Sequence, residues 1–245
     1  MRRFFVTADF TKDRIVVTGS EARHITKVLR LRPGEQVIFF DGTGVECEAE
    51  LEWCTEQEVR ARVKRLAGPE NVSSLVVTLV QSVAKGEKMD LIVQKATELG
   101  VARIIPLISE RTVVRLNEEK KQEKVERWQR IAKEACKQCH RRVLPEITPV
   151  ISWNQVFPLL GKDLVLFLSP EANGMSLKEV LRQNHGRTRV ALLVGPEGGF
   201  SEKEVEEAKR AGFCFAHMGP RIMRTETASI AATAIIMYEL GDVGN

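Results

Sequence analysis

Short apolar runs with the alternation typical of β-strands fill the first quarter of the chain. Five strands are expected, over residues 3–6, 14–18, 36–41, 44–53 and 58–66. Turn signals such as Pro33-Gly34 separate the runs, and one helix is expected over 21–31 with Ser20 as its N-cap. So many short strands in so little chain favour a small, partly closed β-barrel.

The pattern changes after residues 68–74, a turn-rich stretch that is the best candidate linker. From there, longer β-rich apolar runs alternate with helical patterns. Strands are expected over 75–83, 103–108, 164–168, 190–194 and 213–218, and helices over 89–99, 117–142, from about 176, after Ser201 and over 228–240. Gly100 is expected to stop the first of these helices, and Ser201 with Glu204 forms a capping box. This alternation predicts a mostly parallel α/β sheet, with domains at 1–70 and 71–245.

Three consecutive strand–loop–helix units close the chain. Their loops are SPEANG (169–174), GPEGGFS (195–201) and MGPRIMRTETAS (218–229). In a parallel sheet all three leave the carboxyl edge, where open α/β folds bind ligands. The alternative is that they are ordinary tight turns, but two glycine-marked loops followed by RIMRTETA favour a ligand site.

The loop chemistry argues against a phosphate ligand. No GxGxxG motif opens a strand–helix unit, and no GxxxxGK[ST] is present. GPEGG has no lysine and carries Glu197 at its centre. Its glycines suit a close backbone approach to a ligand without phosphate.

Composition fits a globular protein without a membrane span. The chain has 245 residues, 43% hydrophobic and 29% charged, with a net charge of +4. No export leader and no membrane-length apolar run are apparent. Five cysteines, an odd number, show no disulfide framework, so a cytoplasmic location is expected.

Cys136, Cys139 and His140 match a CxxCH haem-attachment string, which we interpret as chance within a helical pattern. No second cysteine pair completes a zinc site, and no metal is expected.

Basic residues gather in two places that suit contacts with an anionic partner. The candidate RNA-binding residues are Arg2, Arg3, Arg23, Lys27, Arg30 and Arg32 near the start, and Lys85 and Lys88 at the sheet edge. A solvated helix face or an exposed loop explains the same residues equally well.

Arg224 and Glu226 stand just before the last apolar helix. The helix dipole explains a glutamate there but disfavours an arginine. Arg224 therefore needs another reason, such as binding an anion or pairing with Glu226 or Glu197.

Two C-terminal motifs of the chain resemble those of a known family. LLVGPEGGFSEKEVEEA (192–208) and MGPRIMRTETASIAA (218–232) resemble the bacterial 16S ribosomal RNA (uracil-N3)-methyltransferase family of the SPOUT superfamily. Stretches 24–35, 85–101 and 126–145 agree, so the resemblance covers nearly the whole chain.

The resemblance implies a PUA-like RNA-binding barrel, and a SPOUT domain with a deep trefoil knot that binds S-adenosylmethionine. The implied cofactor residues are Leu168, Ser169, Val194, Gly195, Pro196, Glu197, Gly198, Gly199, Met218, Gly219, Ile222, Met223 and Arg224. Small side chains at Ala228, Ala231, Ala232 and Ala234 suit a helix threaded through a loop, although a packed core helix explains them too.

The resemblance also implies a homodimer that methylates N3 of a specific uridine in the 16S RNA of the small ribosomal subunit. The N3 proton must leave before the nitrogen can attack, so the site needs a base or a cation. Arg224 is the candidate for the cation, and Glu226 for the base or for orienting Arg224.

Two other functions are weighed against this one. A non-catalytic RNA-binding or ribosome-assembly protein would share the basic residues, but intact GPEGG and RIMRTETA loops argue against a lost cofactor site. A nucleotide-dependent oxidoreductase would share the α/β pattern, but the missing GxGxxG argues against it.

Overall fold

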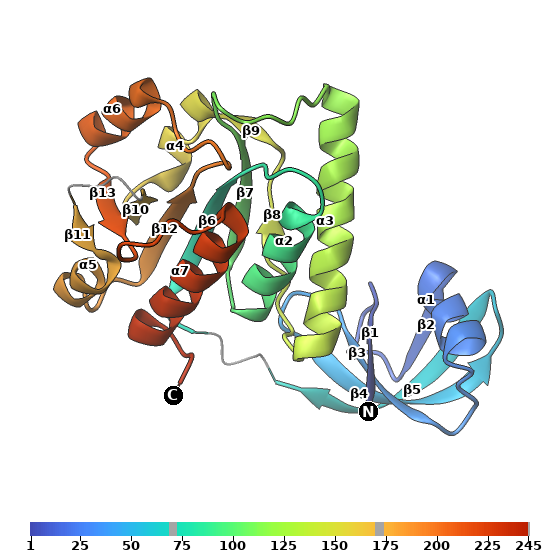
Figure 1. Ribbon diagram of the computed structural model, residues 1–245. Helices are drawn as coiled ribbons and strands as arrows, with labels where there is room; N and C mark the ends of the chain where they lie inside the picture. Colours follow the sequence, from blue (N-terminus) through green and yellow to red (C-terminus); the bar gives the residue numbers. More distant parts are fainter. Residues whose placement is uncertain (69–72, 170–173, 245) are drawn as a thin grey trace. The chain divides into compact units, whose positions relative to one another are not determined.

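The chain forms two compact units in a computed structural model, which describes residues 1–68, 73–169 and 174–244 (Figure 1). One unit contains residues 1–72 and 133–144, and the other contains 73–132 and 145–245. The expected domain boundary at residues 70 and 71 lies outside the described residues, as does most of the SPEANG loop.

The first unit is built on a curled five-stranded sheet. Its strands are β1 (Arg2–Phe5), β2 (Arg14–Thr18), β3 (Gln36–Phe40), β4 (Glu46–Cys54) and β5 (Glu58–Ala67), in the order β1-β3-β4-β5-β2. β1 pairs with β3 in parallel and the remaining pairs are antiparallel. Phe4, Phe39 and Leu51 are fully buried in its core. All five expected strands are confirmed.

The helix of this unit differs from the expected one. α1 (Gly19–Arg23) continues as a π-helical turn, η1 (His24–Val28). Gly19 has a φ of +72°, so it turns the chain out of β2 straight into the helix. The predicted N-cap Ser20 is therefore wrong: it lies inside α1, and Thr18 is the N-cap.

The second unit has an eight-stranded sheet in which every recorded pair is parallel. Its strands are β6 (Val76–Ser82), β7 (Arg103–Ile108), β8 (Glu146–Ile147), β9 (Ile151–Ser152), β10 (Leu164–Leu168), β11 (Met175–Ser176), β12 (Arg189–Val194) and β13 (Cys214–His217). The order is β11-β13-β10-β12-β6-β7-β8, with β9 also on β7. The predicted parallel sheet is confirmed, and the two-residue strands were not expected.

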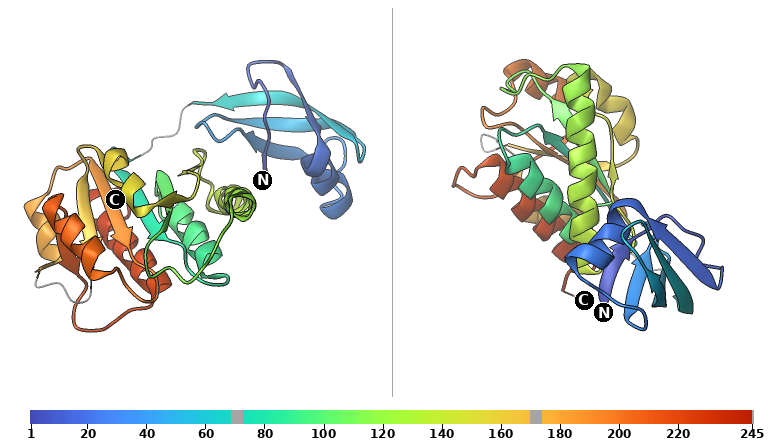
Figure 2. Two further views of the ribbon diagram at one scale, coloured as in Figure 1. Left: turned by 90° about the horizontal axis from the view of Figure 1, so that it is seen from above. Right: turned by 90° about the vertical axis from the view of Figure 1, so that its right-hand side faces the viewer.

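Helices cover both faces of this sheet (Figure 2). α2 (Lys88–Glu98), α3 (Glu118–Cys139), α5 (Leu177–Gln183) and α7 (Thr225–Leu240) serve one face; η2 (Trp153–Gln155), α4 (Phe157–Leu160) and α6 (Glu202–Arg210) serve the other. Side chains alternate along each strand, so Leu79 and Leu192 enter the first core while Val80 and Leu193 enter the second.

Local signals set most helix ends. Ser201 and Glu204 form the expected capping box, and Gly100 stops α2 with a φ of +91°. α3 ends at Cys139, earlier than expected, because His140 takes a left-handed φ of 65°. α7 starts at Thr225, also earlier than expected, and this places Glu226 in its first turn.

Candidate functional site

The ends of β10, β12 and β13 bring three loops together at one sheet edge. Leu168 pairs in register with Val194 on one side and with Ala216 on the other. The loops that follow surround a hollow of about 710 Å³, which we call the loop hollow. All of the cofactor residues expected from the sequence line it: Leu168, Ser169, Val194, Gly195, Pro196, Glu197, Gly198, Gly199, Met218, Gly219, Ile222, Met223 and Arg224.

Glycines shape these loops by conformation and by close packing. Gly199 and Gly219 have φ values of +69° and +95°, which L-residues rarely adopt. Gly195 is short of space instead, because a Cβ there would lie 3.1 Å from the ring of Phe200. Phe200 in turn packs on Phe167, with ring centroids 4.5 Å apart. The backbone therefore forms much of the wall.

Several lining residues were missed by sequence reasoning, notably Phe167, Phe200, Arg111, Arg221 and Thr225. Arg111 comes from the loop after β7 and donates from Nη1 to the carbonyl of Gly198 at 3.2 Å. A position just after a strand at the carboxyl edge was the available signal for Arg111.

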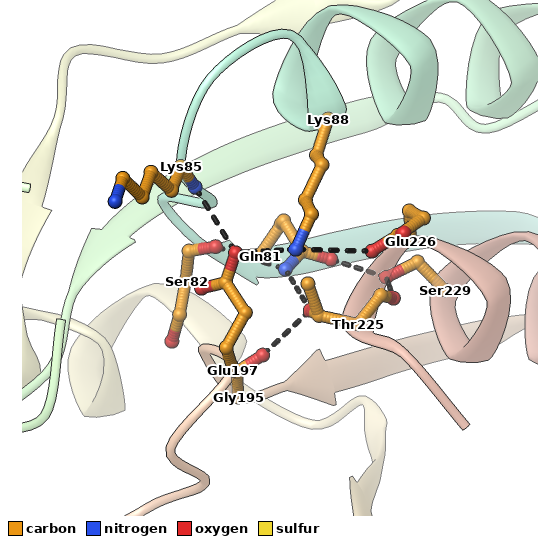
Figure 3. Close-up of polar contacts among 9 residues, drawn as sticks. All are labelled: Gln81, Ser82, Lys85, Lys88, Gly195, Glu197, Thr225, Glu226 and Ser229. Carbon is orange, nitrogen blue, oxygen red and sulfur yellow. Dashed lines mark hydrogen bonds and ion pairs between the residues drawn. The ribbon is translucent and has the colours of Figure 1, made fainter. Parts of the chain in front are cut away.

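Lys88 joins two carboxylates at the rim of the loop hollow (Figure 3). Its Nζ lies 2.8 Å from Oε1 of Glu197 and 3.8 Å from Oε2 of Glu226. The backbone N–H of Lys85 also donates to Glu197, at 3.3 Å. The positive charge at the N-terminus of α2 is thus shared between Glu197 in the loop after β12 and Glu226 in α7.

These contacts shift the pKa values of Lys88 and Glu197. The hydrogen bond to Glu197 is the main cause that raises the pKa of Lys88 above its ordinary value. For Glu197, burial raises the pKa, but the hydrogen bonds from Lys88 and from the backbone outweigh it, and the net pKa is lowered. Both groups are therefore charged at neutral pH.

Of the two reasons considered for the position of Arg224, pairing with Glu226 or Glu197 is absent from the part of the chain described. Lys88 holds Glu197 and faces Glu226, and Arg224 forms no ion pair with a described residue. Arg224 lines the loop hollow, whereas Glu226 lines a neighbouring hollow of about 490 Å³ with Leu91. Lys88 lines both, so it stands between the two predicted catalytic residues.

The basic residues of the first unit divide into exposed and buried. Arg23, Lys27, Arg30 and Arg32 are exposed on or after the α1–η1 turn, and Arg2 is exposed nearby in the sequence. Lys27 pairs with Glu56 at 3.2 Å.

Arg3 does not fit the expected role of an RNA contact. Its side chain is only 5% exposed, pairs with Glu46 at 2.6 Å and lies over the ring of Phe40. A guanidinium buried in this way is not available to phosphate, so the structure removes Arg3 from the RNA candidates. At the edge of the other sheet, Lys85 is exposed.

The CxxCH segment contributes to packing. Cys136 is fully buried in α3, its Sγ lies 3.8 Å from the carbonyl oxygen of Val143, and neither Cys136 nor Cys139 forms a disulfide with a described residue. Among residues 1–68, 73–169 and 174–244, no group of His, Cys, Asp and Glu side chains is placed to hold a metal ion. Within the same residues, none of the helices has the length and apolar character of a membrane span.

A second hollow, of about 840 Å³, opens beside β7, β9 and the start of α6. We call it the charged hollow, because Arg115, Lys121, Lys203, Glu118 and Glu207 are among its lining residues. It contains none of the expected site residues.

Comparison with known proteins gives one consistent family. An RNA methyltransferase domain model matches residues 71–237, and an RNA methyltransferase PUA domain model matches residues 17–64. Ribosomal RNA small subunit methyltransferase E of Bacillus subtilis is 32% identical, covering 98% of this chain and 97% of its own length. The Aquifex aeolicus protein of the same name is 33% identical over 91% of this chain and 93% of its own length.

Solved structures agree. Ribosomal RNA small subunit methyltransferase E from Neisseria gonorrhoeae, bound to S-adenosyl methionine, superposes with a TM-score of 0.92 at 34% identity, covering 99% of each chain. A putative methyltransferase from Legionella pneumophila, in complex with the same cofactor, gives a TM-score of 0.87 at 32% identity and 98% coverage of each chain.

Proposed function

Because this chain belongs to the ribosomal RNA small subunit methyltransferase E family, we propose that its loop hollow binds S-adenosylmethionine for methylation of N3 of one uridine in 16S RNA. The chain is a ribosomal RNA methyltransferase, and S-adenosylmethionine is its methyl donor. The observation that carries the site assignment is the meeting of all the expected cofactor residues around one hollow.

The residues of the loop hollow fit this cofactor. A volume of about 710 Å³ lies in the range of small-molecule sites. Met218, Ile222 and Met223 offer apolar surface to an adenine ring, and glycine backbone offers hydrogen-bonding groups without side chains in the way. The Glu197 carboxylate suits a ligand with a cationic sulfonium, which supplies an activated methyl group when bound.

The acceptor needs proton chemistry that this chain's own residues can provide. N3 of uracil carries a proton and becomes a nucleophile as the proton leaves. We assign proton acceptance to Glu226, whose Oε2 is buried and has no hydrogen-bond partner among the described residues. Arg224, exposed at the rim, supplies positive charge to the uracil oxygens, and Lys88 adds to that charge.

RNA binding is assigned to a domain of residues 1–70, within the first unit, and to the basic edge of the sheet in the second unit. The exposed Arg2, Arg23, Lys27, Arg30 and Arg32 provide cations for phosphate contacts, with Lys85 and Lys88 near the cofactor. The match of residues 17–64 to a PUA domain model supports this assignment, including a PUA-like barrel built from the curled sheet.

A trefoil knot and a homodimer complete the proposal, and the protein is assigned to the cytoplasm. Oγ1 of Thr225, at the start of α7, donates to the carbonyl of Gly195 in the loop after β12, and such a contact between distant loops supports a knotted chain. Beyond that point α7 exposes Ile235 and Tyr238, which are 37% and 66% exposed. Exposed apolar side chains on a helix support a subunit interface there.

The test is a map of modified nucleosides in 16S RNA by mass spectrometry. Cells that lack the gene are expected to lose a single 3-methyluridine, and a plasmid copy is expected to restore it. An unchanged map would remove the uridine assignment. Loss of a different methylated nucleoside would keep the enzyme class but replace the acceptor.

A further inference from the structure

A buried glutamine lies in β6, an interior strand of the second sheet. Gln81, near the carboxyl end of β6, is 0% exposed and lies in register between Val194 of β12 and Pro106 of β7. A side-chain amide in such a place is costly unless its donors and acceptor are satisfied. The neighbours of Gln81 therefore indicate why an amide is placed there.

Its partners are the two hydroxyls at the start of α7 (Figure 3). Nε2 of Gln81 donates to Oγ1 of Thr225 at 3.0 Å and to the carbonyl of Ser82 at 2.9 Å. Oε1 accepts a hydrogen bond from Oγ of Ser229. One amide thus holds the first and second turns of a helix that is 144 residues away along the chain.

Thr225 links Gln81 to the cofactor loop by hydrogen bonds. Its Oγ1 accepts from Gln81 and donates to the carbonyl of Gly195 at 2.7 Å. Strand β6, the start of the Gly195–Gly199 loop and the start of α7 therefore share one buried chain of hydrogen bonds. Networks of this kind hold a single geometry when every member is satisfied.

Thr225, which this network holds in place, lies between Arg224 and Glu226, the two proposed catalytic residues. Arg224 precedes Thr225 as the N-cap of α7, and Glu226 follows it in the first turn. We propose that Gln81 is a positioning residue, which sets Arg224 and Glu226 relative to the cofactor loop through Thr225 and Ser229. This inference rests on the proposed roles of those residues and of the loop hollow.

Thr233 provides a matched control on the same helix. It lies on the face of α7 that carries Thr225 and Ser229, two turns beyond Thr225, and it is 0% exposed. Its hydroxyl has no hydrogen-bond partner in the described part of the chain. Replacing Thr233 with Val removes a buried hydroxyl from this helix without touching the network.

The experiment measures methyl transfer to 16S RNA and binding of S-adenosylhomocysteine for Gln81→Met, Thr225→Val, Thr225→Ser and Thr233→Val. Small displacements of reacting groups reduce turnover by up to about 100-fold. Gln81→Met and Thr225→Val are expected to lower kcat by roughly 10- to 100-fold with an unchanged KM for RNA. Both variants are also expected to bind S-adenosylhomocysteine more weakly than wild type. Thr225→Ser keeps the hydroxyl and is expected to retain most activity, and Thr233→Val is expected to match wild type.

A double variant separates positioning from loss of fold. If the two residues act through one network, Gln81→Met adds little to the kcat loss of Thr225→Val. Additive losses, or equal losses for Thr225→Ser and Thr225→Val, would overturn the inference. A wild-type protein that does not methylate 16S RNA would instead overturn the proposed function.

Discussion

Two hollows open at the carboxyl edge of one parallel sheet, and they are built differently. The loop hollow is walled largely by glycine-rich backbone and apolar side chains after β10, β12 and β13. The charged hollow, beside β7 and β9, has long charged side chains among its lining residues. Both occupy an edge that favours ligands.

The charged hollow uses its polar groups for its own structure. Glu204, which is buried, accepts from the backbone N–H groups of Glu110 and Ser201, and Nε1 of Trp153 donates to Glu207 at 2.7 Å. These two carboxylates are therefore already paired within the protein. In the loop hollow, glycines remove side chains and bring backbone groups to the surface. A ligand site at a sheet edge therefore depends on which groups are already paired, more than on volume.

The largest effect is expected from Glu226→Gln. The change removes the proposed proton acceptor while keeping shape, so kcat for RNA methylation is expected to fall by about 100-fold or more. S-adenosylhomocysteine affinity is expected to stay the same, because Glu226 lines the neighbouring hollow and not the loop hollow. Glu207→Gln, in the charged hollow, is the control and should leave kcat near wild type. Equal rates for both variants would remove Glu226 from the mechanism.

A smaller effect is expected from Lys88→Met, and it depends on pH. The lowered pKa of Glu197 means that its contribution to stability is present above its unfolded pKa and is lost as pH falls through the folded value. The raised pKa of Lys88 keeps its contribution present throughout neutral pH. The variant should therefore melt at a slightly lower temperature than wild type at pH 7. This difference in melting temperature should disappear as the pH falls and Glu197 becomes protonated.

Melting temperatures measured from about pH 3 to pH 8 check this expected pH dependence, because the pKa of an unperturbed glutamate is about 4.3. Lys203→Met is the matched control, because Lys203 lines the charged hollow and forms no ion pair with a described residue. A gap of the same size at every pH, or the same pH dependence in the control, would contradict the account.

The sequence was sufficient where local chemistry decides the structure. Ser201 and Glu204 cap α6 because the two residues satisfy each other three positions apart, whatever surrounds them. Gly100 ends α2 for an equally local reason. The meeting of the loops was predictable because parallel strands bring their carboxyl ends to one edge, whereas the individual cofactor residues came from the family resemblance.

The rest depends on contacts between distant segments. Ser20 was placed as an N-cap because its residue type is favourable, but Gly19 starts the helix earlier. The sequence predicts Arg3 as an exposed cation, whereas in the structure it pairs with Glu46, which is 43 residues away along the chain. No local pattern shows that Lys88 contacts the two carboxylates considered as partners of Arg224, because these carboxylates lie more than a hundred positions further along the chain.

Calorimetric titration with S-adenosylhomocysteine tests the central claim most directly. Wild type and Asn154→Ala, which alters only the charged hollow, are expected to bind one ligand per chain with equal affinity. Gly195→Val places a side chain against the ring of Phe200, 3.1 Å from where its Cβ would lie. The added side chain also changes the wall of the loop hollow, so affinity for S-adenosylhomocysteine is expected to fall by roughly 10-fold or more, which is about 1.4 kcal/mol. Undiminished binding by Gly195→Val with loss of binding by Asn154→Ala would contradict the account.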